Sequence, residues 1–262
     1  MDLKDKRCIV TGASSGIGLA LIQGLAARGA IVLAADIEPI PARGITGVKE
    51  FIADLSNKDG VDALFEEAAG ELGEIDIFIA NAGFAYCERT DAPDWNHIER
   101  IFQMNTVSPI YSLQKLRAQK GDKPFLFVST ASAMSFMPLP GYAVYGATKA
   151  ALRMFNLTAA YELSPGQKIA TIYPVATRTK FFDRASTKYV PWPNQDSSKV
   201  ARAIINGIKA NKTGIFPLPL FQFVNAVFTV LPFAKRVYLK REWLKTGLHK
   251  GHHAGPNKGG MK

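Results

Sequence analysis

The sequence predicts one α/β domain built on a doubly wound parallel sheet with helices on both faces. Three observations lead to this prediction. Short apolar runs alternate with amphipathic stretches along most of the chain, which is the pattern of successive βαβ units. A glycine-rich turn joins the first apolar run to the first amphipathic stretch. The 262 residues, of which 47% are hydrophobic and 21% charged, suffice for one large core and leave little room for a second independent domain.

The apolar periodicity places the strands and helices along the chain. We expect strands over residues 7–11, 31–35, 48–53, 75–80, 124–130 and 168–173. We expect helices over residues 16–28, 58–72, 95–119, 142–163 and 197–210. Pro109 should break or kink the third of these helices, because proline lacks the amide N–H. Prolines and glycines between Asp36 and Val48 predict a loop there instead of a full crossover helix.

Positive charge is concentrated at the C-terminus. From Lys235 onward there are eight Lys or Arg residues and one acid, Glu242, so this end carries +7 of the formal net charge of +10. No nucleic-acid recognition module accompanies it, and we expect no nucleic-acid partner; a membrane surface or an acidic partner suits such a segment. His249, His252 and His253 lie in the same end without a carboxylate or cysteine beside them, so we expect no metal site.

The cysteines and the N-terminus indicate the compartment. Two cysteines, Cys8 and Cys87, are too few for a disulfide framework and do not have the spacing of metal ligands. The charged residues 1–7 lead straight into an apolar strand and lack the features of a signal peptide. We therefore expect a cytoplasmic protein, with peripheral membrane contact through the C-terminus left open.

Residues 11–18, Thr-Gly-Ala-Ser-Ser-Gly-Ile-Gly, form the turn between the first strand and the first helix. Gly12 permits a tight turn, and Gly16 and Gly18 let the backbone approach a pyrophosphate closely. The N-terminus of the helix adds unpaired N–H groups and a partial positive charge. The cofactor-binding residues expected here are Gly12, Ser14, Ser15, Gly16, Ile17 and Gly18. A tight turn without a ligand is the alternative interpretation.

Asp36 follows the second strand and bears on the choice of cofactor. A carboxylate there can accept hydrogen bonds from the adenosine ribose hydroxyls of NAD and would repel the 2′-phosphate of NADP. The nearest base after it is Arg43, in the loop. The sequence therefore predicts NAD in preference to NADP, although a solvated loop position for Asp36 is the alternative.

Tyr145 and Lys149 lie four residues apart on an expected helix, and therefore on one face of it. A free tyrosine has a pKa of about 10, so it needs electrostatic help to act as a base near neutral pH. A neighbouring ammonium stabilises the phenolate and lowers its pKa, which is the physical reason to expect this pair in acid–base chemistry. Taken alone, the pair is more often an exposed helical pair.

Several motifs occur together in a specific order and approximate spacing: the glycine turn, Asn81-Ala82-Gly83, Asn105, Ser132, and Tyr145 with Lys149. In this respect the chain resembles the short-chain dehydrogenase/reductase family over about residues 5–215. Each motif by itself is weak, whereas the combination is specific. In that family the serine lies thirteen residues before the tyrosine, which favours Ser132 over Ser129 and Ser135.

The resemblance implies a Rossmann-type sheet, and it implies roles. Tyr145 would be the acid/base, and Ser132 would hydrogen-bond the substrate oxygen. Lys149 would hold the nicotinamide ribose and tune Tyr145, while Asn105 would position a water in a proton relay. Further cofactor contacts would come from Asp54 and Leu55 at the adenine, from Asn81, Ala82 and Gly83, and from Pro174 and Thr179. Homo-oligomers are common in the family, so the resemblance also implies a homo-oligomer.

The chain departs from the family after the sixth strand, where Val175 follows Pro174 in place of the usual glycine. Valine cannot adopt the conformations open to glycine, so we expect a differently shaped loop on the nicotinamide side. The substrate loop is expected over residues 180–197. Its aromatic residues, Phe181, Phe182, Tyr189 and Trp192, favour an apolar substrate, although a loop packed on its own domain would have the same composition.

Residues 213–234 contain no formal charge and are rich in Phe, Leu and Val. Prolines shorten the uninterrupted helix to about residues 220–231, which is too short to span a bilayer. Three interpretations remain: a membrane span, the least favoured; an interfacial amphipathic helix followed by basic anchors; and a lid or subunit contact. We therefore divide the chain into a catalytic domain, residues 1–212, and a C-terminal extension, residues 213–262.

These observations predict an NAD-dependent oxidoreductase that transfers a hydride between nicotinamide and a secondary alcohol or ketone, with an apolar, lipid- or steroid-like substrate. The alternative is a non-catalytic NAD-binding sensor or scaffold at a membrane surface. A protein that only binds the dinucleotide would have no use for Asn105, Ser132, Tyr145 and Lys149 together, and so the enzyme is favoured.

Overall fold

The computed structural model describes residues 1–41, 44–179, 181–185, 187 and 190–250. Within them, seven strands form one parallel sheet in the order β3-β2-β1-β4-β5-β6-β9. The bounds are β1 (Arg7–Thr11), β2 (Ile31–Asp36), β3 (Val48–Ile52), β4 (Ile77–Ala80), β5 (Phe125–Thr130), β6 (Gln167–Ile172) and β9 (Gly214–Ile215). The strand order reverses beside β1, which confirms the predicted doubly wound sheet.

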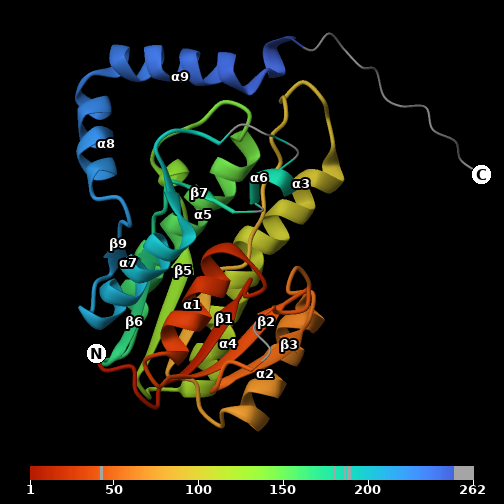
Figure 1. The fold of residues 1–262 in the computed structure, drawn as a ribbon, viewed down its shortest axis with the longest axis vertical. Helices are drawn as coiled ribbons and strands as arrows, with labels where there is room; N and C mark the ends of the chain where they lie inside the picture. The colour runs from red at the N-terminus through yellow and green to blue at the C-terminus, as the bar shows by residue number, and fades with distance from the viewer. Residues whose placement is uncertain (42–43, 180, 186, 188–189, 251–262) are drawn as a thin grey trace, which may run out of the picture.

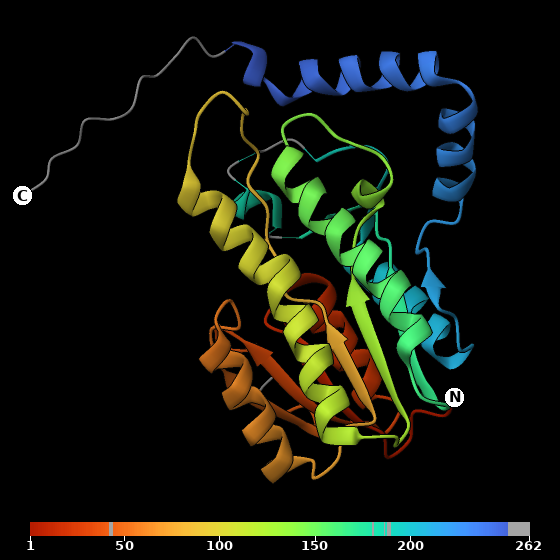
Figure 2. The same cartoon turned by 180° about the vertical axis from the view of Figure 1, so that it is seen from behind.

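Helices cover both faces of the sheet (Figures 1 and 2). One face carries α1 (Gly16–Ala26) and α7 (Ser197–Lys209), and the other carries α2 (Lys58–Glu71), α4 (Ser108–Lys120) and α5 (Ala143–Ala159). A separate apolar core lies under each layer. In the second core the rings of Phe65, Phe78 and Phe127 stack at centroid distances of 5.6 and 5.5 Å. Parallel strands buried on both faces explain why they read as continuous apolar runs in the sequence.

The helix expected over residues 95–119 consists of three segments. α3 (Trp95–Phe102) is capped by the Asp94 carboxylate, which accepts the His97 N–H at 3.0 Å. A π-helical segment, Gln103–Val107, then leads into α4, where Pro109 occupies the first turn. Pro109 therefore does not break the helix. It has no N–H to donate to the carbonyl of Asn105 four residues earlier, and the irregularity lies at that preceding turn.

The sequence missed several elements at the carboxyl end of the sheet. The expected six strands are joined by β9, and a separate pair is formed by β7 (Ala176–Arg178) and β8 (Asn194–Asp196). α6 (Phe181–Arg184) and the 3₁₀ turns Ala133–Ser135 and Leu248–Lys250 were also not predicted. These elements are two to four residues long, which is too short for a periodic signal to develop. In the described residues between Asp36 and Val48 no helix occurs, as expected.

The chain ends in two helices that stand apart from the sheet layers. α8 (Leu220–Val230) matches the expected helix 220–231, whereas α9 (Pro232–Thr246) was not predicted. Figure 1 shows α9 running across the molecule above the loops at the carboxyl ends of the strands, with α8 descending beside them. No helix in the described residues is long and apolar enough to cross a membrane. β9, which the expected division at residue 212 assigned to the extension, pairs with β6 in the main sheet.

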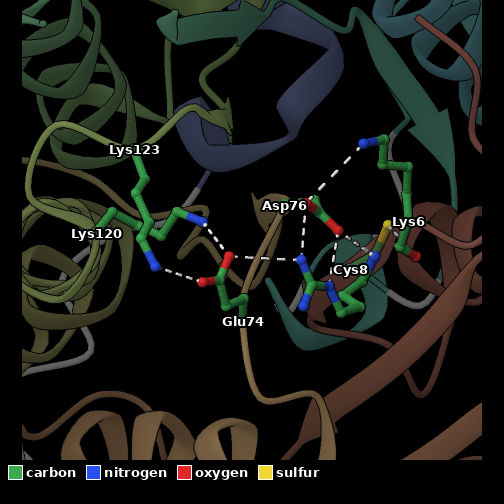
Figure 3. A network of polar contacts seen from close by, with 7 residues as sticks. Lys6, Cys8, Glu74, Asp76, Lys120 and Lys123 are labelled. Carbon is green, nitrogen blue, oxygen red and sulfur yellow. Dashed lines mark hydrogen bonds and ion pairs between the residues drawn. The ribbon is translucent and has the colours of Figure 1, made fainter.

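The amino-terminal end of the sheet is held together by ion pairs (Figure 3). Asp76 accepts the backbone N–H of Arg7 at 2.9 Å and its guanidinium Nε–H at 3.0 Å. Glu74 binds Lys123 at 2.7 Å and Lys120 at 3.3 Å. Hydrogen bonds from Lys123 and then Lys120 lower the pKa of Glu74. Burial raises the pKa of Asp76, but the bonds from Arg7 outweigh it, so the pKa of Asp76 is also lowered.

Candidate active site

The glycine turn adopts a conformation that only glycine permits at three positions. Gly12 has φ +68°, and a Cβ atom there would lie 2.8 Å from the Cα of Ala82. A Cβ at Gly18 would lie 1.9 Å from the carbonyl oxygen of Gly12. Gly16 has φ +55° and faces the methyl group of Thr179. The turn is therefore pressed against its neighbours and leaves the start of α1 open to the carboxyl end of the sheet.

Polar bonds fix the turn to the end of β4. The Thr11 hydroxyl accepts the backbone N–H groups of Asn81 and Ala82, both at 3.0 Å. The Asn81 side-chain amide donates to the carbonyl of Thr11 at 3.1 Å and to that of Gly12 at 3.3 Å. These bonds join β1 and β4 where the strand order reverses, so Asn81 has a structural role in addition to the cofactor contact that the resemblance implies. Such switch points are where parallel α/β sheets bind ligands.

Asp36 ends β2 beside the same turn. Its carboxylate is 8% exposed and accepts the N–H of Ser14 at 2.9 Å and that of Glu38 at 3.1 Å. Each carboxylate oxygen thus holds one backbone donor and keeps capacity to accept another. Asp36 is therefore a fixed, nearly buried carboxylate, and the solvated-loop interpretation is wrong.

A single cavity of about 320 Å³ brings most of the expected residues together. The expected residues that line it are Gly12, Ser15, Gly16, Ile17, Asp36, Asp54, Leu55, Asn81, Ala82, Gly83, Ser132, Tyr145, Lys149, Pro174 and Thr179. Three expected residues do not line it. Gly18 packs on Gly12, Ser14 contributes its N–H to Asp36, and Asn105 is fully buried behind the wall.

Tyr145, Ser132 and Lys149 form one wall of this cavity. α5 presents Tyr145 and Lys149 one turn apart, and the Lys149 Nζ lies 5.8 Å from the centroid of the tyrosine ring. Lys149 is 3% exposed and donates to the carbonyl of Thr130 at 2.8 Å. Ser132, directly after β5, accepts the N–H of Met134 at 3.1 Å. The wall thus offers a phenol, a hydroxyl and an amine to one small volume.

Burial sets the protonation of this wall. Burial raises the pKa of Tyr145 to about 12, and a hydrogen bond with Ser132 opposes the rise. Burial lowers the pKa of Lys149 to about 7. The expectation that Lys149 lowers the pKa of Tyr145 is therefore not met in the protein alone. Among the described residues no carboxylate pairs with the amine, so burial pushes it toward its neutral form. It then has little charge with which to stabilise a phenolate.

Asn105 lies in the π-helical segment and holds the neighbouring loop. Its side-chain oxygen accepts the Phe84 N–H at 3.1 Å, and its amide donates to the Phe84 carbonyl at 2.8 Å and to Thr148 at 3.2 Å. A Cβ at Gly83 would lie 2.8 Å from the Asn105 side-chain oxygen and 3.4 Å from the Lys149 Nζ. The side chain is committed to these partners, so any part in a proton relay falls to its backbone. That role stays a prediction.

Apolar and aromatic side chains line the rest of the cavity. The sequence indicated Phe181 and Phe182, and the ring of Phe181 lies 5.4 Å from that of Tyr145, edge to face. It missed several lining residues: Ile37, Ala53, Ser56, Phe84, Arg100, Met104, Thr130, Met134, Ala176 and Thr177. Thr130 had a usable signal, because polar residues at the carboxyl end of a parallel strand face the ligand site. Arg43, Tyr189, His252 and His253 lie outside the described residues.

Val175 replaces the glycine usual at its position and becomes a packing residue. It is 9% exposed and belongs to an apolar cluster with Ala133 and with Phe221 of α8. The neighbouring Pro174 carbonyl accepts the Ala133 N–H at 2.9 Å. The expected departure on the nicotinamide side therefore consists of a contact between this loop and the C-terminal helices.

Comparisons with known proteins agree with this geometry. A family profile described as short chain dehydrogenase matches residues 6–189. A fatty acyl-CoA reductase of Mycobacterium tuberculosis is 32% identical over 203 residues, covering 70% of this chain and 69% of the relative. The chain belongs to the short-chain dehydrogenase/reductase family of oxidoreductases.

Solved structures share the fold. A short-chain dehydrogenase from Burkholderia phymatum in complex with NAD superposes with a TM-score of 0.76 at 19% identity, covering 86% of this chain and 93% of that one. A short-chain dehydrogenase from Sphingobium yanoikuyae in complex with NADPH gives 0.76 at 23% identity, covering 97% and 99%. Proteins of this fold thus bind either dinucleotide.

The residues present fit a nicotinamide dinucleotide. Ser15 caps α1 without a side-chain hydrogen bond, so the first N–H groups of the helix are available to phosphate oxygens. The glycines at positions 12, 16 and 18 keep the turn free of side chains that would block that approach. Asp36, Asp54 and Leu55 come at the ends of β2 and β3, whereas Lys149 bonds to Thr130 at the end of β5, across the reversal of strand order. This separation suits a long two-headed cofactor.

Proposed function

We propose that this protein interconverts a secondary alcohol and a ketone, using NAD as the hydride carrier. One observation carries the proposal. Tyr145, Ser132 and Lys149 share a cavity with the glycine turn and Asp36, so acid–base groups and dinucleotide-binding groups line the same volume. The alternative function is a sensor that only binds NAD. Such a sensor would need the dinucleotide-binding groups but not the acid–base groups.

The acid–base step falls to Tyr145. In the oxidative direction its phenolate removes the hydroxyl proton of the alcohol, and the Ser132 hydroxyl donates a hydrogen bond to the same oxygen. As an ammonium, Lys149 keeps two N–H donors beyond the one bound to Thr130, and these can hold the cofactor ribose. When bound, the oxidised nicotinamide accepts the hydride and supplies a positive charge. Positive charge in the cavity favours the phenolate, which burial alone disfavours.

The preference for NAD rests on Asp36. Its carboxylate is held by two backbone N–H groups and lines the cavity at the end of β2. A fixed negative charge accepts ribose hydroxyls and repels a 2′-phosphate. We expect Asp36→Asn to narrow the ratio of kcat/KM for NAD over NADP by about tenfold or more. Asp54→Asn, which removes another carboxylate from the lining, is the matched control and should leave the ratio nearly unchanged.

The substrate is proposed to be apolar. Phe84, Met134, Phe181 and Phe182 line the cavity together with Tyr145, and these side chains gain from contact with hydrocarbon. The fatty acyl-CoA reductase among its relatives acts on a substrate with a long apolar chain, which is consistent with this preference.

The test is a turnover assay that follows the absorbance of reduced nicotinamide over secondary alcohols from small to steroid-sized. We expect apolar alcohols to be oxidised and Tyr145→Phe to lose about a thousandfold in kcat while NAD still binds. Calorimetric titration of NAD into the variant separates loss of chemistry from loss of binding. If wild type and Tyr145→Phe bind NAD equally and neither turns over any alcohol or ketone, the sensor is favoured.

A further inference from the structure

The two C-terminal helices, residues 220–246, form an arm that leaves large apolar side chains in solvent. Val230 is 77% exposed and Phe233 78% exposed, and they flank the corner between α8 and α9. Phe223 on α8, Leu231 at the corner, and Val237 and Leu244 on α9 are each more than half exposed. A concentration of exposed apolar side chains on neighbouring elements marks an interaction surface, because single scattered residues are the ordinary case.

Basic side chains border this apolar surface on α9. Phe233, Val237 and Leu244 are separated by four and seven residues, so they share one face of the helix. Lys240 lies on the same face, and Arg236 and Arg241 lie on its two sides; all three are exposed. The helix has one acid, Glu242, which is 1% exposed and bound to Lys245. Among the described residues, no ion pair involves these three exposed bases.

We propose that the arm docks on a membrane surface that contains anionic lipids. Apolar side chains bordered by bases are what an interfacial helix needs, because the former enter the headgroup boundary and the latter bind the lipid charge. A second copy of this chain is the other candidate for the surface. A two-fold contact would bring Arg236, Lys240 and Arg241 of one copy close to the same residues of the other, and repulsion between like charges opposes it.

The arm is fixed to the domain, so docking would orient the whole molecule. Phe221 of α8 is 5% exposed and packs with Val175, next to Pro174 in the cavity lining. The Tyr238 hydroxyl donates to the Trp192 carbonyl at 3.1 Å, and Arg89 donates to the carbonyl of Leu248 at 3.2 Å. Figures 1 and 2 show α9 above the carboxyl ends of the strands. The end of the molecule that carries the cavity would therefore face the bilayer.

Docking does not depend on the proposed redox chemistry, and a vesicle sedimentation assay with the full chain tests it. Vesicles of phosphatidylcholine alone are compared with vesicles that contain about a third phosphatidylserine. We expect binding to the second kind and much weaker binding to the first. The triple variant Arg236→Gln, Lys240→Gln, Arg241→Gln should lose about a hundredfold in partitioning, because each base near an anionic surface contributes severalfold.

Two further variants separate the effects of charge position and of apolar contact on vesicle binding. Arg202→Gln, Lys209→Gln, Lys212→Gln removes the same charge from exposed positions on and after α7 and should bind as wild type. Phe233→Ser with Val237→Ser should lose at least about tenfold while keeping the charges. Circular dichroism and thermal unfolding confirm that each variant is folded, and turnover without vesicles reports on the cavity separately.

Three results would overturn docking. The first is equal binding to neutral and anionic vesicles, or none to either. The second is an equal loss in the α7 control, which would mean that overall charge alone attracts the protein. The third is a protein that does not bind vesicles but changes from dimer to monomer when Phe233 and Val237 become serine. In that case the arm is a subunit contact.

Discussion

The two ends of the sheet treat a buried lysine in opposite ways. At the amino-terminal end, Lys120 is 6% exposed and lies 3.3 Å from the carboxylate of Glu74. At the carboxyl-terminal end, Lys149 is 3% exposed and donates a hydrogen bond to the Thr130 carbonyl at 2.8 Å. A carboxylate compensates the cost of burying an ammonium, whereas a carbonyl dipole does so only in part. The ammonium of Lys120 is therefore stabilised at one end of the sheet. At the other end the ammonium of Lys149 is destabilised, and it lies in the cavity that contains the acid–base groups.

The largest effect should come from Lys149→Met, which removes the buried amine and keeps an apolar side chain of similar length. We expect kcat to fall by about a hundredfold or more, because in the proposed reaction Lys149 holds the cofactor ribose beside Tyr145. We also expect a gain in the free energy of unfolding, of about 3 kcal/mol at pH 7. Chemical denaturation of both proteins in parallel with the turnover assay measures the two changes.

The pH dependence of that gain sharpens the same comparison. Burial depresses the pKa of Lys149 to about 7. The folded wild type therefore carries the full free-energy cost of burying the ammonium at pH 7 and below. The cost shrinks as the pH rises toward the ordinary lysine pKa of about 10.4, where the unfolded chain also loses its proton. The stability difference should thus be large at pH 6 and small at pH 10. A difference that is constant with pH would show that Lys149 is not destabilising through its charge.

The next largest effect should come from Asp76→Asn at the other end of the sheet. This carboxylate accepts three N–H bonds from Arg7, and their weakening should cost about 1–3 kcal/mol of stability at pH 7. The pKa of Asp76 is lowered in the folded protein, so its contribution is complete above the ordinary aspartate pKa of about 3.9 and disappears as the pH falls through the folded value. Acid titrations of both proteins should therefore converge once the pH lies below the lowered pKa of Asp76 in the folded protein. Divergence there would contradict the assignment.

The smallest effect should come from Lys120→Met. Glu74 is partly exposed and keeps Lys123 and Arg7 as partners, so losing Lys120 leaves no buried charge unpaired. We expect a loss of about 1 kcal/mol or less and no change in kcat. The sign of the change in the free energy of unfolding is decisive, because the equivalent substitution at Lys149 should stabilise the protein. If both lysine variants are stabilised, burial decides the cost and the carboxylate partner does not.

Much of the fold was predictable because its signals are local. The runs at residues 7–11 and 31–35 match β1 and β2 to within one residue, since strands buried on both faces are continuously apolar. α1 and α2 were located by helical periodicity and by the turn residues that bound them. β9 was missed because its two residues, Gly214 and Ile215, form a strand only by pairing with β6. α9 was missed because its bases interrupt the apolar pattern used to find helices.

The candidate site was predictable in its members and not in its electrostatics. Helical spacing put Tyr145 and Lys149 on one face, the family resemblance added Ser132, and the cavity contains all three. The pKa of Tyr145 could not be predicted, because the sequence gives the separation of the two side chains along the helix and not the depth at which they are buried. Phe84 and Arg100 were missed because they enter the lining through loop and helix packing and carry no motif of their own.

The sequence by itself determined which chemistry the chain can carry. The glycines of the turn, Asp36 and the Tyr145–Lys149 pair act through residue type and short separations along the chain, and those are fixed before folding. Only the tertiary structure decided how those groups behave. It commits Asn105 to the Phe84 backbone, buries Lys149 against the Thr130 carbonyl, and turns Phe233 and Val237 outward. The burial, the bonding partners and the exposure of each residue depend on segments that are distant in the sequence. The periodicity within one segment therefore cannot predict them.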